Sequence, residues 1–170
     1  MAMPQQAYFL PDEAATEAFG RALGHALAAR LSEPPRIHLE GGLGTGKSSL
    51  ARSVIRALGH AGAVPSPTYT LVEIYEDCRP PVVHMDLYRL SDPEELEFLG
   101  IRELDERGLV WLVEWPERGE GVLPPPGLRI RLTQQDRGRH LLLAWGASTA
   151  EPIREQLMSD ELLKEYAVSC

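Results

Sequence analysis

Residues 41–48 read Gly-Gly-Leu-Gly-Thr-Gly-Lys-Ser and fit the pattern Gly-x-x-x-x-Gly-Lys-Ser/Thr. They follow residues 37–40, which have the pattern of a short strand, and lead into residues 46–58, whose apolar spacing is helical. Glycines let such a loop curl so that its backbone amides point at phosphate groups, and the following helix adds the positive end of its dipole. A glycine-rich turn containing Lys-Ser by chance would not explain the flanking strand and helix, so the segment predicts a phosphate-binding loop.

Two side chains of this loop have predicted roles of their own. Lys47 can reach the β- and γ-phosphates of a nucleotide, and the Ser48 hydroxyl is an oxygen ligand suited to Mg²⁺. The other loop residues contribute mainly backbone donors. We therefore expect the chain to bind ATP with Mg²⁺. The predicted nucleotide-binding residues of this segment are Gly42, Leu43, Gly44, Thr45, Gly46, Lys47, Ser48 and Ser49.

Strands and helices alternate on both sides of the loop. Apolar residues from Ala15 to Leu31 recur at helical spacing, and residues 109–113 form the continuous apolar run of a strand that is covered on both faces. Asp92 begins a short acidic helix as its cap, with Glu95 placed to complete a capping box. Further strands are expected over residues 69–75, 82–85, 130–132 and 140–145, the last two joined by a polar turn over residues 133–139.

This order of elements predicts the fold class. We expect an α/β protein with a three-layer P-loop NTPase fold, in which a mostly parallel central sheet is flanked by helices and ends in an antiparallel strand pair. A length of 170 residues suits one domain, over residues 1–170. The tail from about Thr149 is expected to be a peripheral surface helix.

Composition restricts the classes of function. The chain is 44% hydrophobic and 25% charged, as in ordinary soluble globular proteins, and its two cysteines suggest neither a disulfide scaffold nor a zinc site. Its apolar runs are too short to cross a bilayer and its N-terminus lacks a signal pattern, so we expect a cytoplasmic protein without membrane contacts. A net charge of -8 disfavours a surface that binds DNA or RNA directly. Contact with RNA is expected only through a partner.

Two carboxylates follow predicted strands. Asp86 follows the strand over residues 82–85, and Glu114 follows the apolar run over residues 109–113. Mg²⁺ bound to a nucleotide usually takes one or two carboxylates from such positions. One of the two would hold Mg²⁺ and the other would orient the attacking water, and the sequence leaves open which does which. His84 and Trp111 are interpreted as core residues, whereas Trp115 either lines the site or shields it.

Four motifs together resemble the TsaE family, the bacterial ATPases of tRNA threonylcarbamoyladenosine formation. The order and spacing agree over roughly residues 10–145. One departure is Gly42, where many family members have Asp, but the backbone amides of the loop are unaffected. The motifs are the loop over residues 41–48, Ser-Pro-Thr-Tyr-Thr-Leu-Val at 66–72, His-Met-Asp-Leu-Tyr-Arg-Leu at 84–90 and Glu-Trp-Pro-Glu at 114–117.

The resemblance implies roles for individual residues. Ser48 and Glu114 correspond to the Mg²⁺-associated pair, and Asp86 to a second acidic residue of the site. Thr68 corresponds to a switch threonine, which would become ordered when the γ-phosphate and Mg²⁺ are bound and relax after hydrolysis. More distant positions are also implied to contact the nucleotide. These are Glu13, near the start of the first helix, and Arg139, in the predicted polar turn, which could equally be a solvated turn residue.

The resemblance also implies a biological context. A TsaE protein acts with TsaB and TsaD, which attach the threonylcarbamoyl group to adenosine 37 of tRNAs that read codons beginning with A. Its own ATP hydrolysis is thought to reset the TsaB–TsaD assembly between cycles. The residues expected to act in hydrolysis are Lys47, Thr68, Asp86 and Glu114, and those expected to bind the metal are Ser48, Asp86 and Glu114.

Other functions share the same loop. A GTPase normally selects guanine with an Asn-Lys-x-Asp segment, and this chain contains no Asn. A P-loop small-molecule kinase stays open as an alternative, although Arg137 and Arg139 would make only a thin arginine lid. A scaffold that binds nucleotide without hydrolysing it is the third interpretation.

Overall fold

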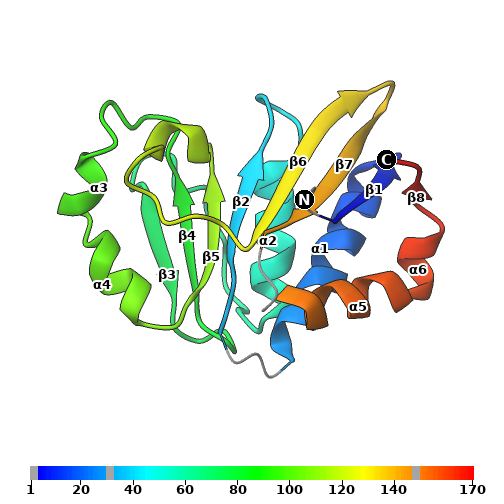
Figure 1. The fold of residues 1–170 in the computed structure, drawn as a ribbon, viewed down its shortest axis with the longest axis horizontal. Coiled ribbons are helices and arrows are strands. Elements are labelled where there is room, and N and C mark those ends of the chain that lie inside the picture. Colours follow the sequence, from blue (N-terminus) through cyan, green and yellow to red (C-terminus); the bar gives the residue numbers. More distant parts are fainter. Residues whose placement is uncertain (1–3, 30–32, 147–149) are drawn as a thin grey trace.

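The structure, a computed structural model, describes residues 4–29, 33–146 and 150–170, so Leu31 and Thr149 lie outside the described residues. A mixed sheet with helices on both faces organises the chain (Figure 1). The helices are α1 (Glu13–Ala28), α2 (Lys47–Ala57), α3 (Glu95–Phe98), α4 (Ile101–Glu106), α5 (Glu151–Ser159), α6 (Glu161–Lys164) and the 3-10 helix η1 (Pro116–Gly119). The strands are β1 (Gln5–Leu10), β2 (Arg36–Glu40), β3 (Val72–Tyr75), β4 (Val82–Asp86), β5 (Val110–Glu114), β6 (Leu128–Gln135), β7 (Gly138–Trp145) and β8 (Ala167–Val168).

The strand order is β3-β4-β5-β2-β6-β7-β1-β8. The pairs β4–β5, β5–β2 and β2–β6 in the middle of the sheet are parallel. The pairs β3–β4, β6–β7, β7–β1 and β1–β8 are antiparallel. The prediction of a mostly parallel sheet was therefore wrong, and the sheet is mixed. Short connections explain part of this, because β3–β4 and β6–β7 are joined by too few residues for the crossover that parallel strands need.

The parallel centre agrees with the sequence prediction. Every residue of β5 is buried, and the strand lies between β4 and β2, as a continuous apolar run predicts. The antiparallel pair β6–β7 is also present but longer than expected, and its turn shrinks to Asp136 and Arg137. Buried residues alternate with more exposed ones over residues 128–133 of β6 and 140–145 of β7, whereas residues 133–135 next to the turn are all exposed.

Two predicted elements begin later than the pattern indicated. The strand expected from residue 69 begins at Val72, because residues 67–70 form a turn in which the Leu71 amide donates to the Pro67 carbonyl at 2.7 Å. The helix expected at Asp92 begins at Glu95. Its capping contact is nevertheless formed in part, since the Asp92 amide donates to the Glu95 carboxylate at 3.2 Å.

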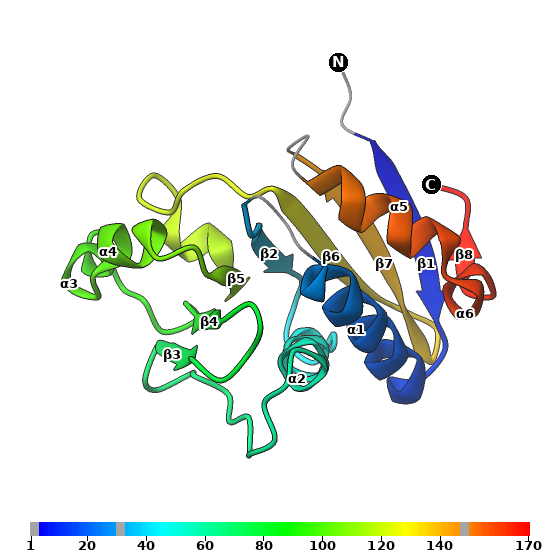
Figure 2. The same cartoon turned by 90° about the horizontal axis from the view of Figure 1, so that it is seen from below.

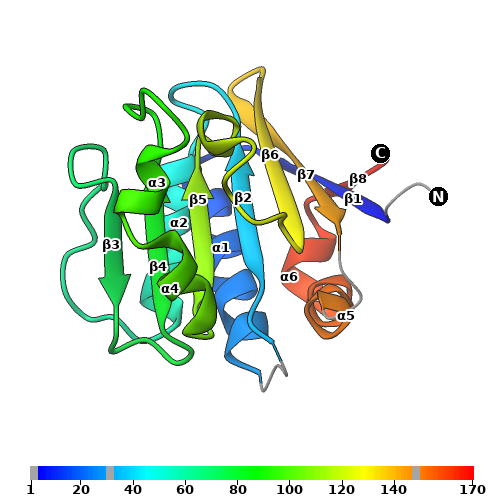
Figure 3. The ribbon, with the colours of Figure 1, turned by 60° about the vertical axis from the view of Figure 1, so that its left-hand side comes forward.

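Helices cover both faces of the sheet (Figures 2 and 3). Helices α1, α2 and α5 cover one face and bury the larger apolar cluster, which includes Phe19, Leu39 and Leu112. Helices α3 and α4 lie on the other face over β4 and β5, where Met85 and Trp111 are buried. Among the described residues, no helix combines the length and apolar character needed to span a membrane.

The C-terminal segment, expected to be a surface helix, forms two helices and an edge strand, and α5 is mostly exposed but buries one face. Helix α5 packs against α1 and buries Ile153 and Leu157, which are four residues apart and so share one helix face. Strand β8 then pairs with β1 at the edge of the sheet. The described part of this segment therefore completes the apolar layer beneath β7 and β1.

Helices α1 and α2 lie side by side beneath the sheet, and glycines on α1 allow their close approach (Figure 2). A Cβ atom added to Gly20 would lie 2.5 Å from the Ser53 Cβ, and one added to Gly24 would lie 2.5 Å from the Ala57 Cβ. Neither distance is possible without movement of a helix backbone. The two glycines therefore fix the spacing of α1 and α2.

We predict that Gly24→Val lowers the free energy of unfolding by about 1–3 kcal/mol, because the added atoms overfill a packed helix interface. Chemical denaturation of the variant checks this value. Glu17→Val is the matched control, since it puts the same side chain at an exposed position of the same helix. Equal losses of stability in both variants would contradict the packing explanation.

Candidate functional site

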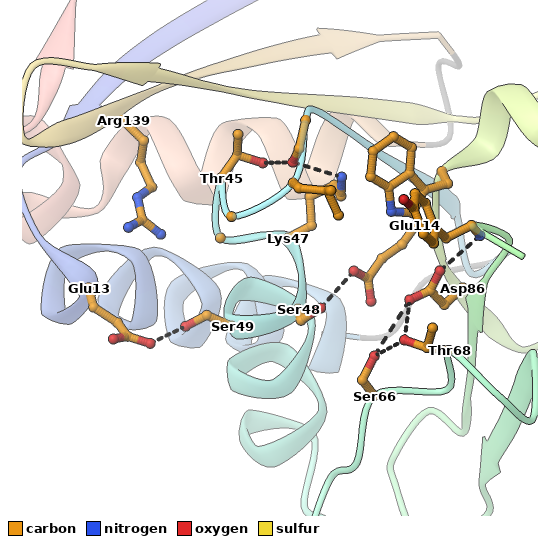
Figure 4. A pocket seen from close by; sticks show the side chains of 16 residues that line it. Glu13, Thr45, Lys47, Ser48, Ser49, Ser66, Thr68, Asp86, Glu114 and Arg139 are labelled. Atoms are coloured by element: carbon orange, nitrogen blue, oxygen red, sulfur yellow. Dashed lines mark hydrogen bonds between the residues drawn. The ribbon is translucent and has the colours of Figure 1, made fainter.

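A cleft of about 490 Å³ lies at the carboxyl ends of three neighbouring parallel strands. Strand β2 leads into the glycine-rich loop, β4 ends at Asp86 and β5 ends at Glu114. In α/β sheets, ligands bind at this edge because connecting loops and helix N-termini meet there. The cleft is lined by Glu13, Gly42, Leu43, Gly44, Thr45, Gly46, Lys47, Ser48, Ser49, Ser66, Thr68, Asp86, Tyr88, Glu114, Trp115 and Arg139 (Figure 4).

Every site residue predicted from the sequence thus lines one cleft. Three further residues line it as well: Ser66, Tyr88 and Trp115. The position of Trp115, which the sequence left open, is on the cleft wall. The roles of these residues stay predictions, but their convergence brings together side chains that lie as far apart in sequence as Glu13 and Arg139.

The Glu114 carboxylate has a partner on each oxygen. Its Oε1 accepts a hydrogen bond from the Ser48 hydroxyl at 2.8 Å, and its Oε2 lies 2.7 Å from His84 Nε2. Glu114 and His84 are buried, with 1% of each residue exposed. A carboxylate accepts hydrogen bonds and does not donate them, so Nε2 carries the ring proton in this pair. The interpretation of His84 as a core residue holds for its burial but missed this contact.

Asp86 organises a second group of polar atoms. Its Oδ2 accepts from the Thr68 hydroxyl at 3.0 Å, and the Ser66 and Thr68 hydroxyls lie 2.8 Å apart (Figure 4). Its Oδ1 accepts from the Tyr88 backbone amide at 3.0 Å. The carboxylate therefore ties the loop that contains Thr68 to the end of β4.

Lys47 lies along the floor of the cleft. Its ammonium group donates to the carbonyl oxygens of Gly41 and Gly42, the latter at 3.1 Å, and lies 3.6 Å from the centre of the Trp115 ring. The pKa of Lys47 is lowered, because burial disfavours its charged form. The nearby carboxylates, Glu114 first among them, offset only part of this effect. Trp115 has a left-handed backbone conformation, with φ of 56°, which turns the chain sharply after Glu114.

Glu13 and Arg139, which are distant from the loop in sequence, reach the cleft from α1 and β7. Glu13, in the first turn of α1, accepts a hydrogen bond from the Ser49 hydroxyl at 3.2 Å. Arg139 extends from β7, and its guanidinium group lies against Gly46. The φ of 102° at Gly46 favours glycine, and a side chain there would also displace the guanidinium end of Arg139.

The donors in the cleft fit Mg²⁺. Ser48, Asp86 and Glu114 supply only oxygen atoms, which this cation prefers, and it usually takes one or two carboxylates together with water and substrate phosphates. No group of three or more His, Cys, Asp or Glu side chains that could hold a metal occurs among residues 4–29, 33–146 and 150–170. The donor set therefore suits a cation that arrives with phosphate oxygens.

The arrangement combines a buried cation, a loop of backbone amides and two carboxylates. Helix α2 begins at Lys47, so its first amides and the positive end of its dipole face the cleft from the same side as the ammonium group. The carboxylates stand opposite, on β4 and β5. Such a site can bind an anionic phosphate chain on one side and hold a metal ion or a water on the other.

Comparison with known proteins agrees with the geometry. The chain is 40% identical over 136 residues to the tRNA threonylcarbamoyladenosine biosynthesis protein TsaE of Haemophilus influenzae, covering 79% of this chain and 86% of that protein. It is 34% identical over 145 residues to the protein of the same name from Bacillus subtilis, covering 84% and 87%. The crystal structure of Bacillus subtilis YdiB superimposes with a TM-score of 0.77 at 26% identity, covering 95% of this chain and 99% of that one. Residues 10–141 match the family described as threonylcarbamoyl adenosine biosynthesis protein TsaE, and the chain belongs to that family.

Proposed function

We propose that this protein is the ATP-hydrolysing component of tRNA N6-threonylcarbamoyladenosine modification, which binds Mg-ATP and cycles a TsaB–TsaD assembly. Membership of the TsaE family supports the tRNA modification. The observation that carries the hydrolytic role is the meeting of Lys47, Ser48, Asp86 and Glu114 in one cleft. We also propose a cytoplasmic location, since the ATP and tRNA that the reaction needs are present there.

Each part of the cleft has a task in this proposal. The loop amides and Lys47 would bind the phosphates, while Ser48 and Glu114 would hold Mg²⁺. The bound metal would supply positive charge that stabilises the phosphates during transfer. Asp86 would orient the attacking water. It accepts a hydrogen bond from Thr68. Thr68 would change position with the presence or absence of the γ-phosphate.

The contacts of Glu13 and Arg139 suggest how the rest of the nucleotide is held. Glu13 is a carboxylate acceptor beside Ser49, and it is available to the base amine or the ribose hydroxyls. Arg139 adds a cation next to Gly46 at the mouth of the loop. We assign the two residues to the nucleotide rather than to the hydrolytic step.

The test is phosphate release from ATP by the purified protein, measured with and without TsaB and TsaD. The proposal expects slow turnover alone and faster turnover with both partners. A small-molecule kinase would instead form ADP without free phosphate and only with an acceptor. A nucleotide-binding scaffold would bind ATP tightly and show no turnover even with both partners.

We predict that the isolated protein binds tRNA weakly, with recruitment to RNA dependent on TsaB and TsaD. The chain has 25 acidic and 17 basic residues, so there is little source for the counterion release that drives binding to a phosphate backbone. A salt titration of tRNA binding checks this. Tight binding that weakens steeply with salt would mean that the protein handles RNA directly.

A further inference from the structure

We infer that His84 is a positioning residue that fixes the Glu114 carboxylate for the metal ion. The inference rests on the proposed function, since it deepens the role given there to Glu114. It starts from one contact, the 2.7 Å hydrogen bond between His84 Nε2 and Glu114 Oε2.

The register of the sheet explains how the two side chains meet. Strands β4 and β5 are parallel neighbours in which His84 pairs with Leu112 and Asp86 with Glu114. Residues two apart on a strand share a face, so His84 and Asp86 point to the same side of the sheet, as do Leu112 and Glu114. His84 therefore lies one step behind Asp86, on the face covered by α2, and Glu114 meets it across the strand pair.

The contact leaves Glu114 little freedom. One carboxylate oxygen is held by Ser48 and the other by His84, so the plane of the group is set from both sides. Ser48 is itself a predicted metal ligand, so its hydroxyl would have to serve the metal as well. His84 is then the partner that keeps Glu114 in place regardless of what Ser48 binds.

The burial of His84 is poorly explained by packing alone. The His84 side chain is 2% exposed, and its Nδ1 is buried without any hydrogen-bond partner. Burying an unpaired ring nitrogen costs free energy, and the neighbouring core positions of β4 are occupied by Val83 and Met85. An imidazole in this place therefore has a function in its contact with Glu114 that an apolar side chain would not serve.

Groups that hydrogen-bond to a metal-ligating side chain typically change metal affinity or activity by about 10–100-fold when removed. We therefore expect His84→Leu to raise, by about tenfold or more, the Mg²⁺ concentration needed to strengthen the binding of a non-hydrolysable ATP analogue. His84→Gln should retain most of the wild-type Mg²⁺ requirement, because its amide nitrogen extends about as far as Nε2. His84→Asn, with a shorter side chain, should resemble His84→Leu.

The experiment is calorimetric titration of the analogue at a series of Mg²⁺ concentrations, with thermal unfolding of each variant as the control for folding. The same titrations in a Glu114→Ala background separate positioning from structure. If His84 acts through Glu114, then His84→Leu has no further effect on the Mg²⁺ requirement in that background. An equal effect in both backgrounds, or an unchanged Mg²⁺ requirement in His84→Leu, would overturn the inference.

Two outcomes distinguish this inference from the proposed function. If the wild-type protein fails to hydrolyse ATP even with TsaB and TsaD, the hydrolytic proposal fails, but the analogue titration still tests His84. If His84→Leu does not fold, the comparison of His84→Gln with His84→Asn decides the question through their Mg²⁺ requirements. Equal requirements in these two variants would count against positioning by Nε2.

Discussion

Lys47→Ala should weaken ATP binding by about 10- to 100-fold. Lys47 is the only side-chain cation within the loop, and hydrogen bonds to charged groups contribute about 1.5–3 kcal/mol, with 1.4 kcal/mol equal to a factor of ten in affinity. The backbone amides remain in the variant, so some phosphate affinity should survive. Calorimetric titration with ATP and Mg²⁺ measures the change.

The control for Lys47→Ala is Arg56→Ala, which removes one positive charge from an exposed position at the other end of α2. Its ATP affinity should equal that of the wild type. Thermal unfolding of both variants excludes a folding defect. Unchanged ATP affinity in Lys47→Ala would contradict the phosphate-loop assignment.

Glu114→Ala and Asp86→Ala should each reduce ATP hydrolysis by about 100- to 1,000-fold and change nucleotide affinity much less. Groups that shape charge and water geometry act mainly in the transition state, and removing one such group typically has an effect of this size. Hydrolysis is measured with saturating ATP and Mg²⁺ in the presence of TsaB and TsaD. Affinity is measured separately by calorimetry.

The matched control for both carboxylates is Glu120→Ala, which removes an exposed carboxylate after η1. Glu114→Gln adds a second comparison, because it keeps the shape of the side chain while removing its charge. Losses of the same size in hydrolysis and in affinity would identify Glu114 or Asp86 as structural carboxylates.

The sequence predicted the centre of the fold because local signals there agree with each other. The loop over residues 41–48 needs a strand before it and a helix after it, and both are present as β2 and α2. The uninterrupted apolar run that became β5 could only be stable with cover on both faces. Asp86 and Glu114 were found for the same reason, since the carboxyl ends of parallel neighbours meet at one edge.

The edges of the sheet were predicted less well because their pairing is non-local. The apolar part of strand β1 covers only residues 7–10, and the strand gains its place from pairing with β7, about 130 residues later in the chain. Helix α5 likewise depends on α1 for cover. The alternating pattern over residues 69–75 suggested one strand, yet Leu71 has a left-handed φ of 68°, so the strand begins only at Val72 and Thr68 lies in a turn from which it reaches Asp86.

Within the site, the contacts that the sequence did not predict are also non-local. Glu13 and Arg139 were found only through family resemblance, because no local pattern links them to the loop. The His84 contact with Glu114 joins residues 30 positions apart, and a histidine in an apolar strand resembles any other core residue in the sequence. A polar residue two positions before a strand-end carboxylate is the one signal that could have pointed to it.

The close packing of α1 on α2 also sets the position of Glu13 relative to Ser49 in the cleft. A helix rises about 1.5 Å per residue, so sliding α1 along α2 by one residue would move Glu13 by nearly half its present 3.2 Å separation from Ser49. Gly20 packs against Ser53 and Gly24 against Ala57, one and two helical turns beyond Ser49 on α2, and these contacts oppose that slip. The alignment of an acceptor at the mouth of the cleft is thus set by two residues that have no side chain.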